Sequence, residues 1–154
     1  MLSEDNVRPS GTSDAIVAAV AKASEAFEYV ERVRGHLFSL HQLMGRADFL
    51  FEDAADELLA AGATPWAARF KREIVGRNVL DGRWTFQVVD EFDRVYYRPV
   101  LEAFLALEEA LLEGRHHVYE SELKEERRTR SLAGHDARPS ESPDAGSSTS
   151  RSTA

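Results

Sequence analysis

The sequence predicts an all-α protein built on a long antiparallel helical hairpin with a short connecting helix. Two observations carry this prediction. Apolar residues recur in alternating steps of three and four over two long stretches, and a short Gly- and Pro-containing junction separates them. We expect a helical domain over residues 14–130, between a disordered polar lead (1–13) and a disordered tail rich in Ser, Pro, Ala and Gly (131–154).

The first helix is expected to begin after Thr12 or Ser13, because either side chain can cap its amino end. The apolar repeat continues to about residue 58, which makes a helix of about 45 residues and about 65 Å. Gly45 is the expected position of a bend. The repeating residues are Ile16, Val20, Ala23, Phe27, Val30, Val33, Leu37, Leu40, Met44, Ala47, Phe51, Ala54 and Leu58.

The junction then supplies a stop signal and a start signal. Gly62 can end the first helix, Thr64 can cap the next one, and Pro65 suits its first position. A short second helix is therefore expected from Pro65 to about Val75, closed by Gly76.

A third helix is expected to begin near Trp84, after a turn at Asp81 and Gly82, and to run to about Arg128. Pro99 lies inside this pattern, where it removes a backbone hydrogen bond and clashes with the preceding turn. The helix should kink or restart there. Residues 81–89 are also rich in strand-forming side chains, but they have no evident pairing partner, so helix is favoured.

Folding of the two long helices onto each other would place residues near 60 and 84 side by side. The apolar arc is wider than one partner helix requires, so we expect a homodimer that completes a four-helix bundle. The alternative is that the short helix and the kink cover more of this arc. The surplus residues are Phe38, Phe49, Leu101, Leu105 and Leu112.

The composition narrows the class of protein. Absence of cysteine excludes disulfides, thiolate metal sites and thiol catalysis, and it fits a cytoplasmic location. The amino-terminal residues lack the apolar region of a signal peptide, and no run is long enough to span a membrane, so we expect neither export nor insertion. The net charge of −8 disfavours nucleic acid and anionic membranes as partners. Signature motifs of P-loop, dinucleotide-binding, zinc-protease and serine-hydrolase sites are absent.

Four polar residues are candidate metal ligands. His41, Asp48 and Glu52 project within about 60° of Leu37 on the first helix. Asp93 projects inward on the third helix, and the expected hairpin places it opposite Asp48 and Glu52. Imidazole and carboxylates ligate Mn, Fe or Zn, and clustered carboxylates can transfer protons.

The favoured interpretation of these residues is structural, with no cofactor. Arg34, Arg94 and Arg98 can pair with the acids, and such a network fixes helix register without a ligand. The fragment Glu113–His116 has the E-x-x-H spacing of carboxylate metal sites, but Glu113 projects away from the apolar stripe.

Charge is segregated around the junction. An acidic end of the first helix precedes a basic, aromatic stretch between Trp66 and Trp84. This stretch could contact phosphates or single-stranded nucleic acid, but pairing within the chain is the simpler account. The acidic residues are Asp48, Glu52, Asp53, Asp56 and Glu57, and the basic ones are Arg69, Lys71, Arg72, Arg77 and Arg83.

The stretches 74–77, 82–93, 117–120 and 123–128 resemble a group of short, uncharacterised helical proteins of actinobacteria and haloarchaea. The resemblance covers residues from about 35 to 130. It implies no assigned activity, substrate or cofactor, so it transfers no functional residue.

The sequence therefore favours a non-enzymatic helical protein that self-associates and acts through protein contacts. The alternative is a helical bundle that binds a metal or a small molecule through His41, Asp48, Glu52 and Asp93.

Overall fold

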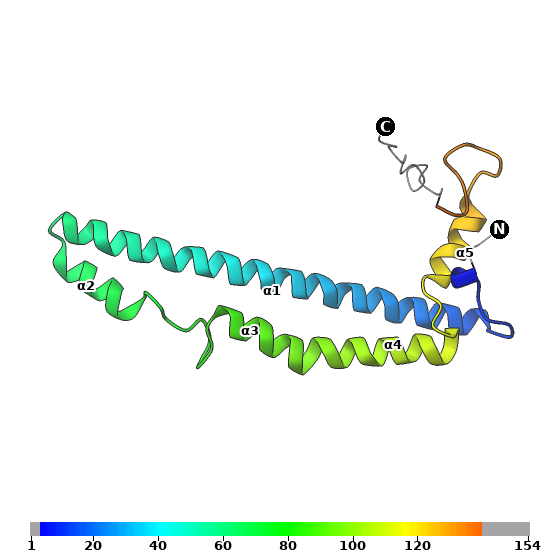
Figure 1. Cartoon of the computed structure of the whole chain (residues 1–154), viewed down its shortest axis with the longest axis horizontal. Coiled ribbons are helices and arrows are strands. Elements are labelled where there is room, and N and C mark those ends of the chain that lie inside the picture. Colours follow the sequence, from blue (N-terminus) through cyan, green and yellow to red (C-terminus); the bar gives the residue numbers. More distant parts are fainter. Residues whose placement is uncertain (1–3, 140–154) are drawn as a thin grey trace, which may run out of the picture. The chain divides into compact units, whose positions relative to one another are not determined.

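The computed structural model describes residues 4–139, and the expected all-α class is confirmed (Figure 1). The chain forms two compact units, one of residues 22–107 and one of residues 4–21 with 108–139. Each unit is described separately below. The helical elements are η1 (Glu4–Asn6), α1 (Asp14–Ala60), α2 (Thr64–Glu73), α3 (Thr85–Phe92), η2 (Asp93–Tyr97), α4 (Arg98–Leu112) and α5 (Val118–Arg127).

Helix α1 is continuous over 47 residues, close to the expected length. The amide of Ile16 donates to Oγ of Ser13 at 3.3 Å, so the predicted Ser13 cap is confirmed. Gly35 and Gly45 lie inside the helix without interrupting it. A glycine weakens a helix by only about 1 kcal/mol, which the rest of this long element offsets.

Helix α2 lies along the last turns of α1 instead of capping its end (Figure 1). Lys71 Nζ contacts Asp56 Oδ1 at 2.5 Å, and the rings of Phe70 and Phe51 meet edge to face with centroids 6.0 Å apart. The helix begins one residue earlier than expected, so Thr64 is its first residue and not its cap. The N-cap position falls on Ala63, and no side chain at that position bonds the amides of the first turn.

The turn predicted at Asp81 and Gly82 is confirmed. Leu80 and Arg83 exchange two backbone hydrogen bonds of 3.1 and 3.0 Å around it, and Gly82 adopts φ +67°. Helix α3 follows, so residues 85–89 are helical and not a strand.

The interruption expected at Pro99 takes the form of a π-helical turn. In η2 the amide of Arg98 donates to the carbonyl of Asp93, five residues back, and α4 then begins. Because Pro99 has no N–H, it cannot continue the regular ladder, and the wider turn lies directly before it.

The third predicted helix ends earlier than expected, which corrects the prediction of a helix to Arg128. Helix α4 stops at Leu112, and Glu113, Gly114 and His117 all have positive φ before α5 begins. The glycine is a normal helix terminator. The apolar pattern continues across the break because Val118 is buried as well. This residue, however, is the first of the separate helix α5.

Part of the lead that was expected to be disordered makes specific contacts within residues 4–21 and 108–139. Asn6 donates to the carbonyl of His116 at 2.8 Å, and Arg8 pairs with Glu122 through contacts of 2.5 and 2.6 Å. Pro9 is buried. Such contacts span more than a hundred positions, so local composition gives no sign of them. Of the tail predicted to be disordered, residues 140–154 lie outside the described residues.

The hairpin register also differs from the prediction. In the unit of residues 22–107, Arg34 faces Asp93, and His41 faces Thr85. Residue 60 is therefore not beside residue 84. The reason is that α2 and residues 74–84 run back alongside α1, so α3 begins about five helical turns below the junction.

Candidate functional site

Helix α1 carries two neighbouring heptad stripes. Among the described residues, one of them packs against the other helical elements, and the second is largely exposed. The first, called the inner stripe, contacts α3, η2, α4 and the segment after α2. Phe27 stacks on Phe104 with centroids 5.2 Å apart, Arg34 pairs with Asp93, and Ala55 is fully buried. The inner stripe comprises residues 27, 34, 41, 48 and 55, together with 30, 37, 44, 51 and 58.

The second stripe, called the outer stripe, is largely exposed. Leu43 is 71% exposed, Tyr29 57%, Leu50 49% and Val33 47%. A single exposed leucine on a helix is ordinary, but a continuous row of exposed apolar side chains is not. Such rows mark association surfaces. The outer stripe comprises residues 26, 33, 40, 47 and 54, together with 29, 36, 43, 50 and 57, all apolar except His36 and Glu57.

A hollow of about 360 Å³ lies between α1 and the η2–α4 segment. Its wall on α1 includes Ala26 of the outer stripe and Phe27 and Val30 of the inner one, and Val100 and Phe104 face them. The complete lining is Ala23, Ala26, Phe27, Val30, Tyr96, Val100, Ala103, Phe104 and Leu107. The outer stripe thus borders an apolar groove of the hairpin.

The surplus residues predicted from the sequence divide into two groups. Phe38, Phe49 and Leu105 are exposed, at 41%, 62% and 46%. Leu101 is half-buried and Leu112 is buried. Three of the five surplus residues are therefore exposed, and two are at least partly covered by the chain itself. The outer stripe is a different surface, because it contains none of these five residues.

A polar network links α1 to η2. Arg34 bonds both oxygens of Asp93, at 2.8 and 2.9 Å, and its guanidinium carbon lies 4.6 Å from the centre of the Tyr97 ring. The Tyr97 hydroxyl donates to Glu31 at 2.6 Å. Hydrogen bonding to Arg34 holds the pKa of Asp93 below its ordinary value, and the bond to Glu31 raises the pKa of Tyr97.

His41 and Thr85 form a second link. Nδ1 of His41 lies 2.8 Å from Oγ1 of Thr85, and Thr85 is only 2% exposed at the start of α3. The contact satisfies the hydroxyl of a buried side chain. The sequence did not predict this contact, because the expected hairpin placed residue 84 beside residue 60 and not near His41.

The four candidate metal ligands are not brought together. His41 bonds Thr85, Asp93 bonds Arg34, and Oδ1 of Asp48 accepts the amide of Gly76 at 2.7 Å. Glu52 is exposed on the side that faces Lys71. In the part of the chain that the structure describes, no group of three or more His, Asp or Glu side chains has the geometry to hold a metal ion. The register explains the difference, since Asp93 lies opposite Arg34 and not opposite Asp48.

Asp48 instead lines a cavity of about 260 Å³ between α1 and the segment that follows α2. Arg77 and Asn78 add polar groups, and the walls include Phe51 and Trp84. The remaining lining residues are Met44, Ala47, Ile74 and Val79. This cavity combines apolar walls with a few convergent polar groups, which is typical of a small-molecule site.

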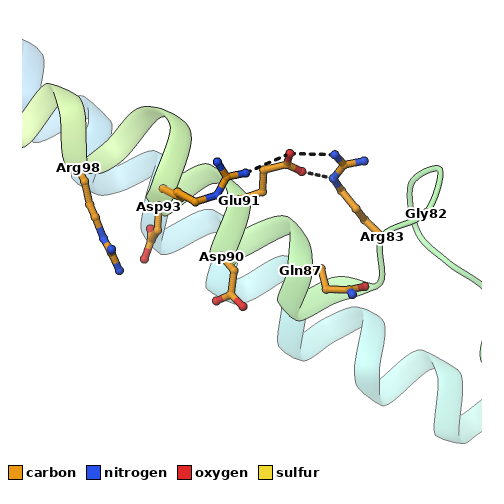
Figure 2. A pocket seen from close by; sticks show the side chains of 8 residues that line it. Gly82, Arg83, Gln87, Asp90, Glu91, Asp93 and Arg98 are labelled. Carbon is orange, nitrogen blue, oxygen red and sulfur yellow. Dashed lines mark hydrogen bonds and ion pairs between the residues drawn. The ribbon is translucent and has the colours of Figure 1, made fainter.

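Figure 2 shows a larger and more polar hollow, of about 560 Å³, along α3 and η2. Arg83 holds Glu91 by two bonds, one of them 2.8 Å long, and Arg94 approaches the same carboxylate at 3.7 Å. Asp90 and Asp93 extend on another side of the helix from Glu91 (Figure 2). The lining of this hollow has equal numbers of positive and negative side chains. They are Arg83, Arg94 and Arg98, and Asp90, Glu91 and Asp93. Such a balanced surface does not favour an anionic ligand.

The basic, aromatic stretch also pairs within the chain. Lys71 binds Asp56, Arg69 and Arg72 both bind Glu73, and Arg69 lies over the Trp66 ring at 5.4 Å. These pairings agree with the simpler account of the charge segregation.

In the other unit, Glu108 is buried and accepts a bond from Nδ1 of His116 at 2.8 Å. His116 belongs to the predicted E-x-x-H fragment, but that fragment is the non-helical segment between α4 and α5. Glu113 is turned toward Arg115 instead, at 3.0 Å.

No protein family, curated protein or solved structure matches the chain. The resemblance of residues 35–130 to short actinobacterial and haloarchaeal proteins therefore stays a prediction. Among the described helices, none is both long and apolar enough to cross a membrane.

Proposed function

We propose that the protein is a self-associating interaction module in which two copies bury their outer stripes to form a four-helix bundle. The observation that carries this proposal is the exposed second heptad stripe on α1, with Leu43 71% exposed and Leu50 49% exposed. Helices of a four-helix bundle contact two neighbours each, so each carries two adjacent apolar seams. Within residues 4–139, the chain's own elements cover mainly one seam of α1.

The chemistry of the outer stripe favours a helical partner. Its spacing alternates between three and four residues over about eight turns, which is the repeat of knobs-into-holes packing. Ala26, Ala47 and Ala54 allow close approach of a facing helix, and Tyr29 and Leu43 supply large side chains to fill it. A second copy offers a groove of the same length and the same composition, which an isologous dimer needs.

The test is the molar mass of the full chain by light scattering after size exclusion. We expect twice the mass of one chain for the natural sequence. The double variant Leu43→Glu with Leu50→Glu should have the mass of one chain, because it places charges on the seam while leaving the inner stripe intact.

Phe49→Glu is the matched control. Phe49 is on the same helix and 62% exposed, but it lies off the outer stripe, so this variant should remain dimeric. Circular dichroism of all variants checks that helicity is retained. A natural chain of single mass, or a Leu43→Glu with Leu50→Glu variant that stays dimeric and helical, would refute the proposal.

A further inference from the structure

The cavity beside Asp48 has two charged groups of opposite sign that do not neutralise each other. Oδ1 of Asp48 accepts the Gly76 amide at 2.7 Å, which fixes the carboxylate and leaves Oδ2 without a partner among the described residues. Among residues 4–139, Arg77 bonds the carbonyl of Glu73 alone, through Nη1 at 3.4 Å. In the described part of the chain no ion pair joins Asp48 to Arg77, although both line this cavity of about 260 Å³.

The rest of the cavity wall is apolar. Phe51 and Met44 come from α1, and Ile74 and Trp84 close the cavity from the returning segment. Trp84 is half-buried at the start of α3, where its amide is held by Gln87 Oε1 at 2.8 Å. A flat indole and a phenyl ring at one small cavity suit an apolar or aromatic group of a ligand.

From this arrangement we propose that the cavity binds a free amino acid with an apolar side chain, with phenylalanine-like rings preferred. The ammonium group would bind Asp48, the carboxylate would bind Arg77, and the side chain would lie against Phe51 and Trp84. Hydrogen bonds between an ammonium group and a carboxylate, or between a guanidinium and a carboxylate, are stronger than bonds between neutral groups. The planar guanidinium of arginine also matches the two oxygens of a carboxylate. The volume is slightly below the usual range of about 300–1,000 Å³ for drug-sized ligands, which restricts the ligand to about one ring.

The inference goes beyond self-association and does not depend on it. Met44, Asp48 and Phe51 belong to the inner stripe, and five lining residues belong to the chain's own returning segment. Of the lining residues, Ala47 alone belongs to the outer stripe. A monomer would hold the same cavity.

Trp84 gives a direct readout. The chain has two tryptophans, so Trp66→Phe leaves Trp84 as the single indole, and Trp66 is an exposed side chain. Phenylalanine is titrated into this protein while tryptophan emission is recorded, and isothermal titration calorimetry repeats the measurement on the natural chain. Phenethylamine, which lacks the carboxylate, and 3-phenylpropionate, which lacks the ammonium group, are the comparison ligands.

We expect saturable binding of phenylalanine with a Kd of about 1 mM or tighter, and binding of each comparison ligand weaker by about tenfold or more. Asp48→Asn keeps the oxygen that accepts the Gly76 amide but removes the charge. It should weaken phenylalanine and phenethylamine while leaving 3-phenylpropionate unchanged. Arg77→Gln should show the opposite selectivity, and the exposed controls Asp53→Asn and Arg72→Gln should bind as the natural chain does.

Absence of saturable binding by both methods would overturn the proposal, and so would equal binding of phenylalanine by Asp48→Asn, Arg77→Gln and the natural chain. The molar mass measured on the same samples separates the two proposals. A single chain that binds phenylalanine contradicts only the dimer, and a dimer that binds none contradicts only the amino acid site.

Discussion

Arg34 on α1 and Asp93 at the first position of η2 form a two-pronged ion pair, with Nε to Oδ1 at 2.8 Å and Nη2 to Oδ2 at 2.9 Å. This geometry fixes both the distance and the rotation between the two elements, because a guanidinium and a carboxylate meet in one plane. It therefore favours one register of the hairpin.

Replacement of Asp93 by Asn should lower the free energy of unfolding by about 1 kcal/mol, since the pair is partly exposed and partly screened by solvent. Chemical denaturation followed by circular dichroism measures this change. Asp90→Asn, an exposed acid on the same helical segment, is the control and should change stability by less than about 0.5 kcal/mol. Equal effects of the two variants would mean that the pair between Arg34 and Asp93 adds no specific stability.

Acid should destabilise the protein through the same carboxylate. Because Arg34 lowers the folded-state pKa of Asp93, the pair stabilises the fold above the unfolded-state pKa, near 3.9, and this contribution is lost as pH falls through the lower folded-state value. Glu73, Glu91 and Glu125 also have lowered pKa values from bonded arginines, so they act in the same direction. Thermal melts between about pH 5 and pH 2 should show a falling Tm, with a shallower slope for Asp93→Asn. A slope that is unchanged in this variant would contradict the assignment.

Two glycines should respond to alanine with opposite signs. Gly114 has φ +69° at the end of α4, so Gly114→Ala should lower the free energy of unfolding by about 1 kcal/mol. Gly35 lies in the helix with open space around it, so Gly35→Ala should raise stability by up to about 1 kcal/mol. Denaturant midpoints compare the two variants. Stabilisation by Gly114→Ala would mean that α4 and α5 can join as one helix.

Arg8 should hold the amino-terminal segment to α5. Its guanidinium bonds both oxygens of Glu122 and also Asp14, the last at 2.6 Å, and these bonds raise its pKa. Arg8→Met should increase the hydrogen exchange of α5 amides while leaving residues 30–60 unaffected. Arg32→Met, on the surface of α1, is the control. Unchanged exchange in α5 would show that the segment is held by other contacts.

The elements were predictable because their signals are local. A serine cap at Ser13, a stop at Gly62 and a turn at Asp81 and Gly82 depend on residues that are neighbours in sequence. The break at Gly114 carried such a signal too. It was overlooked because Val118 continues the apolar pattern although it belongs to another helix.

The site was less predictable because it depends on register. The projection correctly placed His41, Asp48 and Asp93 toward the neighbouring element, but it could not show which residues face them. The path of α2 decides that, and it rests on long-range contacts such as the one between Lys71 and Asp56. An error of about five turns in register separated Asp93 from Asp48 and joined it to Arg34.

The π-helical turn at Asp93–Tyr97 sets the phase of everything after it. This turn takes up one residue more than an α-helical turn does. The apolar positions that face α1 therefore shift by one residue in the sequence between α3 and α4. If this turn became regular α-helix without loss of a residue, Val100 and Phe104 would rotate by about 100° away from Phe27. Deletion of one residue within the turn would instead leave a regular helix with nearly the same phase. The extra residue is thus absorbed within η2, and both α3 and α4 keep their apolar sides toward α1.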